Sequence, residues 1–241
     1  MDTALTAIAD SLWAYEYDLR LGPGFYLPVR TTAIRRADGG LVLWSPGPLS
    51  DGLAAAIEAL GEVRVLVAPN RLHHLYVADA RRRFPGAALL LAPGLAEKRP
   101  DLDGANLADG AGVLGPEFEL RTIDGATKLG EVVAFHRPSA SLLVTDLVFN
   151  LSRTRGWLTP WILRLAGVLG RYNQSRLIRT LVDDRAAAGA SVRAMLTWPF
   201  ERVVTCHGGV VDGADVRERT ADALEWMLAA APGLAGASQI S

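Results

Sequence analysis

The stretch that decides the fold reads Val63-Arg64-Val65-Leu66-Val67-Ala68-Pro69-Asn70-Arg71-Leu72-His73-His74. Its first six residues are largely β-branched or apolar, which predicts a buried strand. Two adjacent histidines, His73 and His74, follow where that strand should end. The chain has only 4 histidines, so a pair at a strand end is informative about function as well as fold.

Two later apolar runs end in the same manner. Residues 142–145 lead to Asp146, and residues 202–206 lead to His207. Imidazole and carboxylate groups at the ends of separate strands are what a metal site at a sheet edge requires. The pattern therefore predicts a metal-dependent site built from three separate strands.

Around this stretch, strands alternate with helices. A strand over 41–44 and a helix from Ser50 or Asp51 to about Leu60 precede it, while a helix over 75–84 and a strand over 88–92 follow it. No linker and no internal repeat divides the chain, which favours one α/β domain whose sheets are covered by helices. We expect this domain to span residues 1–232, with a helical insertion over 150–190 and a flexible tail over 233–241. The other predicted elements are strands over 26–29, 31–34, 118–123, 131–136, 141–149 and 200–206, and helices over 158–170, 175–188 and 216–230.

Composition narrows the class of protein. Of the 241 residues 50% are hydrophobic and the net charge is −1, which gives no electrostatic reason to expect a nucleic acid partner. The single cysteine, Cys206, excludes an intramolecular disulfide and suits a reducing compartment. The most apolar stretch, 157–170, is too short to span a bilayer and contains Arg164. We expect a cytoplasmic protein that acts on a small molecule.

The order of these motifs resembles the metallo-β-lactamase-like hydrolase superfamily, and most closely a divergent domain-of-unknown-function branch of it. The residues that carry the resemblance are the strand–helix–strand unit with its histidine pair, Thr145-Asp146-Leu147 after a hairpin, and Cys206-His207-Gly208-Gly209. The resemblance implies a four-layer αβ/βα sandwich.

The family signature His-x-His-x-Asp-His, laid on residues 69–74, shows a one-sided departure. Pro69 and Arg71 fall on the histidines of the first metal site, and neither can ligate a cation. The loop that brings the third histidine of that site reads Asp124-Gly125-Ala126-Thr127-Lys128 and has none. The first metal site is therefore expected to be absent.

The second metal site keeps all four of its positions, with the aspartate of the family replaced by His73. The resemblance implies His73, His74, Asp146 and His207 as ligands of one divalent ion, with zinc favoured and iron, nickel or manganese also suited. Four protein ligands would close a tetrahedral zinc shell, whereas three would leave a position for water. Whether His73 and His74 both bind, or one of them lies outside the shell, stays open.

Other polar residues have weaker claims on the site. Arg71 could bind a carboxylate or phosphate of the substrate or form a salt bridge with Asp146. Glu131 and Asp124 each have a possible place near the metal. Cys206, next to His207 on a strand, should face the opposite side as buried core. His136, at the far end of its strand, should be remote from the site.

By resemblance the reaction is hydrolysis of an ester, thioester, lactone or amide by a metal-bound water. The alternative is a catalytically inactive domain of the same fold retained for ligand binding or protein interaction. The apolar insertion 150–190 could form a lid, an apolar wall or the face of a homodimer.

Overall fold

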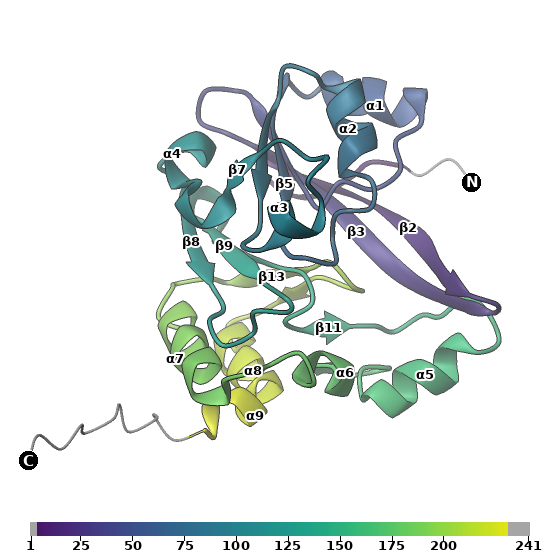
Figure 1. Ribbon diagram of the computed structural model, residues 1–241, viewed down its shortest axis with the longest axis vertical. Coiled ribbons are helices and arrows are strands. Elements are labelled where there is room, and N and C mark those ends of the chain that lie inside the picture. The colour runs from purple at the N-terminus through teal and green to yellow at the C-terminus, as the bar shows by residue number, and fades with distance from the viewer. Residues whose placement is uncertain (1–3, 231–241) are drawn as a thin grey trace, which may run out of the picture.

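Two mixed β-sheets form the centre of the molecule, and helices lie on the outer face of each (Figure 1). The computed structural model describes residues 4–230. The first sheet has seven strands in chain order: β1 (Thr6–Ala9), β2 (Leu12–Gly22), β3 (Phe25–Arg35), β4 (Leu41–Trp44), β5 (Val63–Ala68), β6 (Ala88–Leu91) and β7 (Ala105–Asn106). The second has five strands in the order β14 (Val211–Asp212), β13 (Arg202–Thr205), β10 (Ser141–Val144), β9 (Val132–His136) and β8 (Phe118–Thr122).

Helices cover these sheets from both sides. The first sheet carries α1 (Asp51–Glu58), α2 (Val77–Arg83) and α3 (Leu95–Lys98). The second carries α7 (Arg185–Met195), α8 (Val216–Ala223) and α9 (Glu225–Leu228). The remaining elements are α4 (Ala111–Leu114), α5 (Thr159–Ala166), α6 (Arg176–Arg179), two 3-10 turns at Leu107–Asp109 and Arg137–Ser139, and the small sheet of β11 (Phe149–Asn150) and β12 (Tyr172–Asn173).

Three apolar layers hold this arrangement together. Leu53 and Ile57 of α1 pack on Leu66 of β5, and Val192 of α7 packs in the layer that contains Phe135 of β9. A further layer between the two sheets is formed by buried side chains of both: Val42, Val65, Leu90, Ala134, Leu143 and Val204. The predicted four-layer αβ/βα sandwich is confirmed.

Strand direction explains why the candidate residues meet. β5 runs parallel to β4 and β6, and β10 runs parallel to β13 with Val144 opposite Thr205. Parallel strands present their carboxyl ends at one edge, so Asp146 and His207 emerge together just beyond β10 and β13.

The sequence did not predict the long hairpin at the start of the chain. β2 and β3 pair along their length from Leu12 with Ile34 to Gly22 with Phe25, so the two strands predicted over 26–29 and 31–34 are one. Arg30, which separates the two predicted runs, pairs with Glu16 in the β2–β3 ladder, and its guanidinium bonds to the Thr205 carbonyl and to Glu16.

Two predicted helices are broken in the structure. The segment 175–188 contains α6 and the start of α7, because the Asp184 side chain accepts the Ala187 N–H and starts a new helix there. The final helix divides at Leu224 into α8 and α9. The predicted flexible tail, 233–241, lies outside the described residues. Between residues 4 and 230 no helix is long and apolar enough to cross a membrane.

His136 lies at the end of β9 that is opposite the carboxyl edge of β10, as expected. It is fully buried against Phe118, with Nδ1 2.8 Å from Ser139 Oγ. Burial, only partly opposed by Glu117, lowers its pKa to about 4.

This shift makes stability depend on pH. The unfolded chain takes up a proton near the ordinary histidine pKa, while the folded chain resists it, so stability is full at neutral pH and falls from about 6.5 towards 4. His136 should contribute a loss of about 2 kcal/mol between pH 7.5 and 5.0, while His73 and His207, whose pKa values are raised, act in the opposite direction. The difference in urea unfolding between the parent and His136→Phe isolates the His136 contribution. His136→Phe should flatten this dependence; an unchanged slope in that variant would assign it to other groups.

Candidate metal centre

Three predicted ligands converge on one point. His73 Nε2 lies 3.2 Å from His207 Nε2 and 3.3 Å from Asp146 Oδ2, and His207 Nε2 lies 3.2 Å from Asp146 Oδ1. A tetrahedral ion with bonds of about 2.0–2.1 Å keeps its ligand atoms about 3.3 Å apart. The spacing of the three groups therefore fits a single metal ion.

Hydrogen bonds on the far side of each ring fix which nitrogen faces the centre. His207 Nδ1 donates to the Pro28 carbonyl at 2.8 Å, which leaves the lone pair on Nε2. His73 Nδ1 lies 2.7 Å from Ser45 Oγ, which can accept its proton. Such partners orient histidine ligands and raise their basicity.

The Asp146 carboxylate is held from behind. The buried Asn70 amide donates to Asp146 Oδ2 at 2.7 Å, and its carbonyl accepts the Leu72 and His73 N–H groups. Asn70 thus fixes the orientation of the Asp146 carboxylate and the conformation of the turn that carries His73. Glu131 accepts the backbone N–H groups of Thr145 and Asp146 at 2.8 and 2.9 Å.

The electrostatics of the cluster favour a cation. Burial disfavours the charged form of His73, but Cys206 and Asp146 outweigh it and hold the pKa of His73 well above its usual range. The same carboxylate raises the pKa of His207 against burial, and the two imidazoles lower the pKa of Asp146 despite its burial. A metal ion and protons therefore compete for the same nitrogens, so metal affinity should rise with pH.

Cys206 lies at this centre, contrary to expectation. Its thiol is 3.5 Å from His73 Nδ1 and donates to the Arg30 carbonyl at 2.9 Å. His73, Cys206 and His207 form a group, with ligand atoms within 4.8 Å of one another, that could hold a metal ion. The prediction failed because β13 ends at Thr205, so the alternation of a strand no longer governs where the next side chain points.

The two edges of the His73 ring distinguish the possible ligand sets. Cys206 approaches the Nδ1 edge, whereas Asp146 and His207 face Nε2. One ion cannot bind both edges of one imidazole. If the Nε2 set holds the ion, Cys206→Ala should lower zinc affinity by no more than about 10- to 100-fold, the effect of an outer partner. Titration calorimetry measures this, and a much larger loss would make the thiol a ligand.

His74 does not join the cluster. Its Nδ1 lies 2.8 Å from the Arg99 guanidinium, which can only donate, so this nitrogen accepts. Burial, Lys98 and Arg99 lower the pKa of His74. Its ring is therefore a neutral one with the proton on Nε2, and the two cations beside it oppose a metal ion on that ring.

Arg71 turns away from the centre. Its guanidinium donates to the Thr127 carbonyl at 3.1 Å, and its backbone N–H donates to Leu129. The described residues include no Arg71–Asp146 salt bridge, since Asn70 takes the place of that partner. The loop 124–128, which has no histidine at the position of the first metal site, is thus bonded directly to Arg71.

The other two acidic candidates, Asp124 and Glu131, both have carboxylates that are engaged in hydrogen bonds. Asp124 bonds to Ser191 of α7 through its carboxylate and its backbone, away from the histidines. Glu131 does lie beside Asp146, but both its oxygens accept backbone N–H groups. A general-base role for either is not supported by these contacts.

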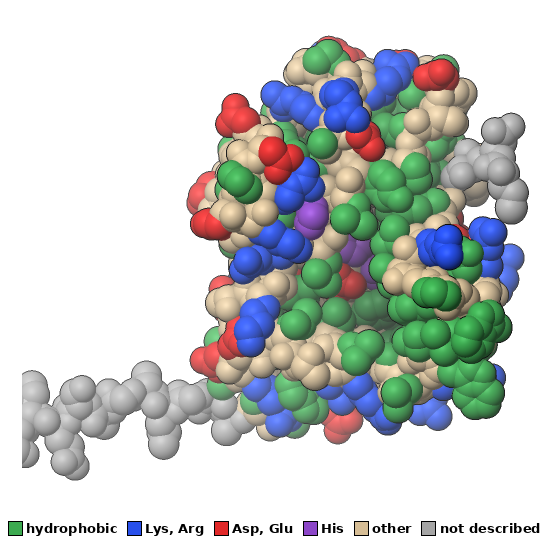
Figure 2. Space-filling view, turned by 45° about the vertical axis from the view of Figure 1, so that its right-hand side comes forward, with side chains coloured by type: hydrophobic (Ala, Val, Ile, Leu, Met, Phe, Trp, Pro, Cys, Tyr) green, Lys and Arg blue, Asp and Glu red, His purple; other side chains and the backbone are tan. Residues whose placement is uncertain are grey.

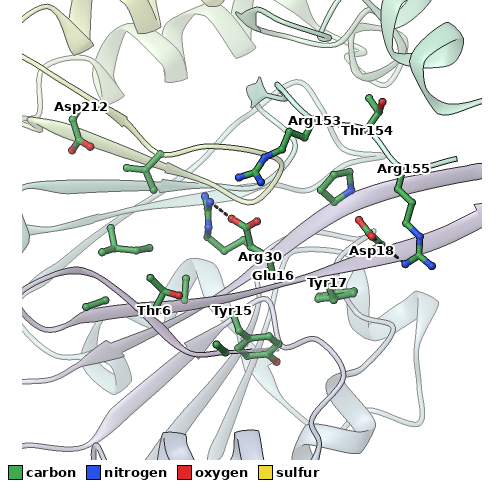
Figure 3. A pocket seen from close by; sticks show the side chains of 16 residues that line it. Thr6, Tyr15, Glu16, Tyr17, Asp18, Arg30, Arg153, Thr154, Arg155 and Asp212 are labelled. Carbon is green, nitrogen blue, oxygen red and sulfur yellow. Dashed lines mark hydrogen bonds and ion pairs between the residues drawn. The ribbon is translucent and has the colours of Figure 1, made fainter. Parts of the chain in front are cut away.

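Arg30 secures the loop that presents His207. Its guanidinium donates to the Thr205 carbonyl at 2.7 Å and its backbone N–H to the Cys206 carbonyl at 2.7 Å. An ion pair with Glu16 fixes the far side of the guanidinium at the edge of a cavity of about 950 Å³ (Figure 3). The sequence analysis gave no role at the site to Arg30, Ser45 or Asn70, because their contacts with distant segments appear only in the folded chain.

A pocket of about 320 Å³ opens above the centre. His73, Asp146 and His207 line it together with His74 and Lys98. The rest of its wall is mainly apolar and comes from the β2–β3 hairpin and the turn after β5: Tyr17, Leu19, Leu21, Leu27, Val29, Leu72, Leu75 and Tyr76. Figure 2 shows histidine side chains within a hollow that has hydrophobic side chains beside it.

Solved structures with the same arrangement identify the fold. A metallo-β-lactamase from Pontibacter korlensis superimposes with a TM-score of 0.64 over 93% of this chain and 99% of that one, at 17% identity. The fold is that of the metallo-β-lactamases. No protein-family model and no curated protein sequence matches the chain.

Other proteins with the metallo-β-lactamase fold are equally distant in sequence. The metallo-β-lactamase FIM-1 from Pseudomonas aeruginosa, solved in a mono-zinc form, gives a TM-score of 0.63 at 15% identity over 93% of this chain and 96% of its own. The Flv1 flavodiiron core from Synechocystis gives 0.61 at 13% identity over 94% of this chain and 61% of its own. At such identities the likeness establishes the metallo-β-lactamase fold alone.

Proposed function

We propose that this protein is a hydrolase that uses one divalent metal ion, zinc in the first instance, held by His73, Asp146 and His207. The observation that carries the proposal is the convergence of His73 Nε2, His207 Nε2 and the two Asp146 oxygens, with contacts of 3.2–3.3 Å, in the lining of a pocket. Two imidazoles and one carboxylate leave coordination positions open, as catalytic sites require. A bound ion supplies a Lewis acid that polarises a carbonyl and activates water.

The pocket lining favours an acyl substrate with an apolar chain. Leu19, Leu27 and Val29 on the hairpin offer a hydrophobic wall directly above the metal ligands. An ester, thioester, lactone or amide would place its carbonyl at the floor and its chain along this wall. Burial of each methylene contributes about 0.8 kcal/mol, so chain length should control affinity.

His74 has the chemistry of a donor in this pocket. Its Nδ1 accepts from Arg99 and its pKa is lowered by burial, Lys98 and Arg99, so the ring is neutral with a proton on Nε2. We assign to it a hydrogen bond to the substrate carbonyl or the donation of a proton to the leaving group. This role differs from the ligand role that the sequence suggested.

The test is hydrolysis of p-nitrophenyl esters from acetate to octanoate by zinc-loaded protein at pH 8. We expect activity that rises with chain length, disappears with chelator, returns with zinc and is lost in His207→Ala. His136→Gln, a change of the remote buried histidine, is the matched control and should keep activity. Protein that binds zinc yet hydrolyses no ester, thioester, lactone or amide would overturn the enzymatic role and favour an inactive, ligand-binding domain.

A further inference from the structure

The surface of α5 and α6 carries the four most exposed large hydrophobic side chains of the described residues. Trp157, Trp161, Leu165 and Leu177 are 71%, 68%, 75% and 58% exposed. Trp161 and Leu165 lie four residues apart on one face of α5, Trp157 lies two residues before the helix, and Leu163 and Ala166 on the other face of α5 are buried. Figure 2 shows hydrophobic side chains gathered at this side of the molecule.

The segment that carries this face is rich in arginine and contains no acidic residue. Between Asp146 and Asp183 the chain has no Asp, Glu or Lys and six arginines, a formal charge of +6 in a protein whose net charge is −1. They are Arg153, Arg155, Arg164, Arg171, Arg176 and Arg179. Of these six arginines, only Arg155 forms an ion pair within the described residues, with Asp18 (Figure 3). Within the described residues no carboxylate pairs with the other five, although Arg176 and Arg179 bond to neighbouring polar groups, so these charges are available to an anionic partner.

We propose that this surface docks on a membrane that contains anionic lipids. An interfacial helix combines Trp and Leu on one face with basic side chains around them, so that the apolar groups enter the acyl boundary and the cations contact headgroups. The α5 helix and its surroundings have both features. Arg164 lies over the Trp161 ring, with its guanidinium carbon 5.9 Å from the ring centroid, so its charge borders the apolar face rather than leaving it.

A second copy of the chain fits this surface less well. A symmetric dimer would place the same patch on both sides, so arginines would face arginines, and the only carboxylate paired with any of the six within the described residues is Asp18, on Arg155. A nucleic acid would satisfy the arginines and could stack on the tryptophans, but it offers no apolar surface to Leu165 and Leu177. Of these three occupants, a lipid surface alone matches both the charge and the aliphatic groups.

The position of the patch connects it to the pocket. The Trp157 indole lies directly on Gly24 at the tip of the β2–β3 hairpin, leaving no room for a side chain there. Leu158 and Thr159 donate backbone N–H groups to the Gly24 carbonyl. The hairpin that carries Leu21 and Leu27 into the pocket is thus anchored on the docking surface. An apolar ligand could pass from the membrane to the pocket along this hairpin.

The test is co-sedimentation of the full chain with vesicles of phosphatidylcholine alone and of phosphatidylcholine mixed with phosphatidylserine, in the absence of added metal. We expect binding to the mixed vesicles, with a blue shift of tryptophan fluorescence, and little binding to the neutral ones. Raised salt should weaken binding because it screens the arginines. Trp161→Ser with Leu165→Ser, and separately Arg164→Gln with Arg171→Gln, should each weaken it by about tenfold or more.

Matched controls lie elsewhere on the surface. Val113→Ser removes an exposed hydrophobic side chain of α4, and Arg82→Gln removes an exposed arginine of α2; neither should change vesicle binding. Absence of binding to mixed vesicles would overturn the proposal. So would a concentration-dependent dimer that the α5 substitutions dissociate, or binding to a single-stranded oligonucleotide with none to vesicles. Because the readout is binding, a failed hydrolase assay leaves this result unaffected.

Discussion

Replacing Asp146 with asparagine should lower the affinity for zinc by on the order of a thousandfold, more than the 10- to 100-fold loss typical of an outer partner. Asp146 is the only carboxylate of the proposed ligand set, and its two oxygens lie 3.3 Å from His73 Nε2 and 3.2 Å from His207 Nε2. Asparagine has the same shape but supplies no negative charge to offset the cation. Hydrolysis should fall with metal content. Titration calorimetry at pH 8 measures the affinity.

The control for this variant is Asp124→Asn, a carboxylate that the sequence also placed near the site. The structure bonds Asp124 to Ser191 instead, so its loss should leave zinc affinity unchanged. Circular dichroism should show Asp146→Asn folded. An Asp146→Asn protein that binds zinc as tightly as the parent would remove this carboxylate from the metal site.

Glu131→Gln should destabilise the protein by about 2–4 kcal/mol, the cost of losing charge-assisted hydrogen bonds and leaving a buried N–H without an acceptor. Glu131 is fully buried and accepts the N–H groups of Thr145 and Asp146 with its two oxygens. Burial and the Asp146 charge raise its pKa, so the position tolerates a carboxylate at a cost. Glutamine removes that charge, but its side-chain NH2 group then faces one of the two backbone N–H groups, and neither can accept from the other.

Urea unfolding at neutral pH measures the change, with Glu119→Gln as control. Glu119 lies on the neighbouring strand β8, where its side chain is 35% exposed and pairs with Arg137, so its loss should cost below about 1 kcal/mol. Equal stability of Glu131→Gln and the parent would mean that the two backbone N–H groups find water, and that Glu131 does not hold the Asp146 turn.

The sequence predicted what depends on local pattern. Apolar runs such as 63–68 and 202–205 form strands because β-branched residues suit buried parallel strands, and strand ends then determine where Asp146 and His207 emerge. The four-layer architecture followed from the order of these runs and the family they resemble. The ligand set that we propose uses three of the four residues that the sequence selected.

What the sequence did not predict depends on contacts between distant segments. His73 and His74 are adjacent, and only the bonds of Asn70 to the turn and of Arg99 to His74 Nδ1 decide which ring faces Asp146. Cys206 faces His73 because its strand has already ended, and Ser45 reaches the same ring from a different loop. Such choices are made by packing, and no periodicity in the sequence records them.

The most direct test of the metal centre is a crystal structure of zinc-loaded protein with anomalous data collected at the zinc edge. We expect one peak per chain, within about 2.0–2.3 Å of His73 Nε2, His207 Nε2 and an Asp146 oxygen, with His74 and Cys206 outside the shell. A peak bonded to Cys206 Sγ and His73 Nδ1, or no peak after loading at micromolar zinc, would contradict the account.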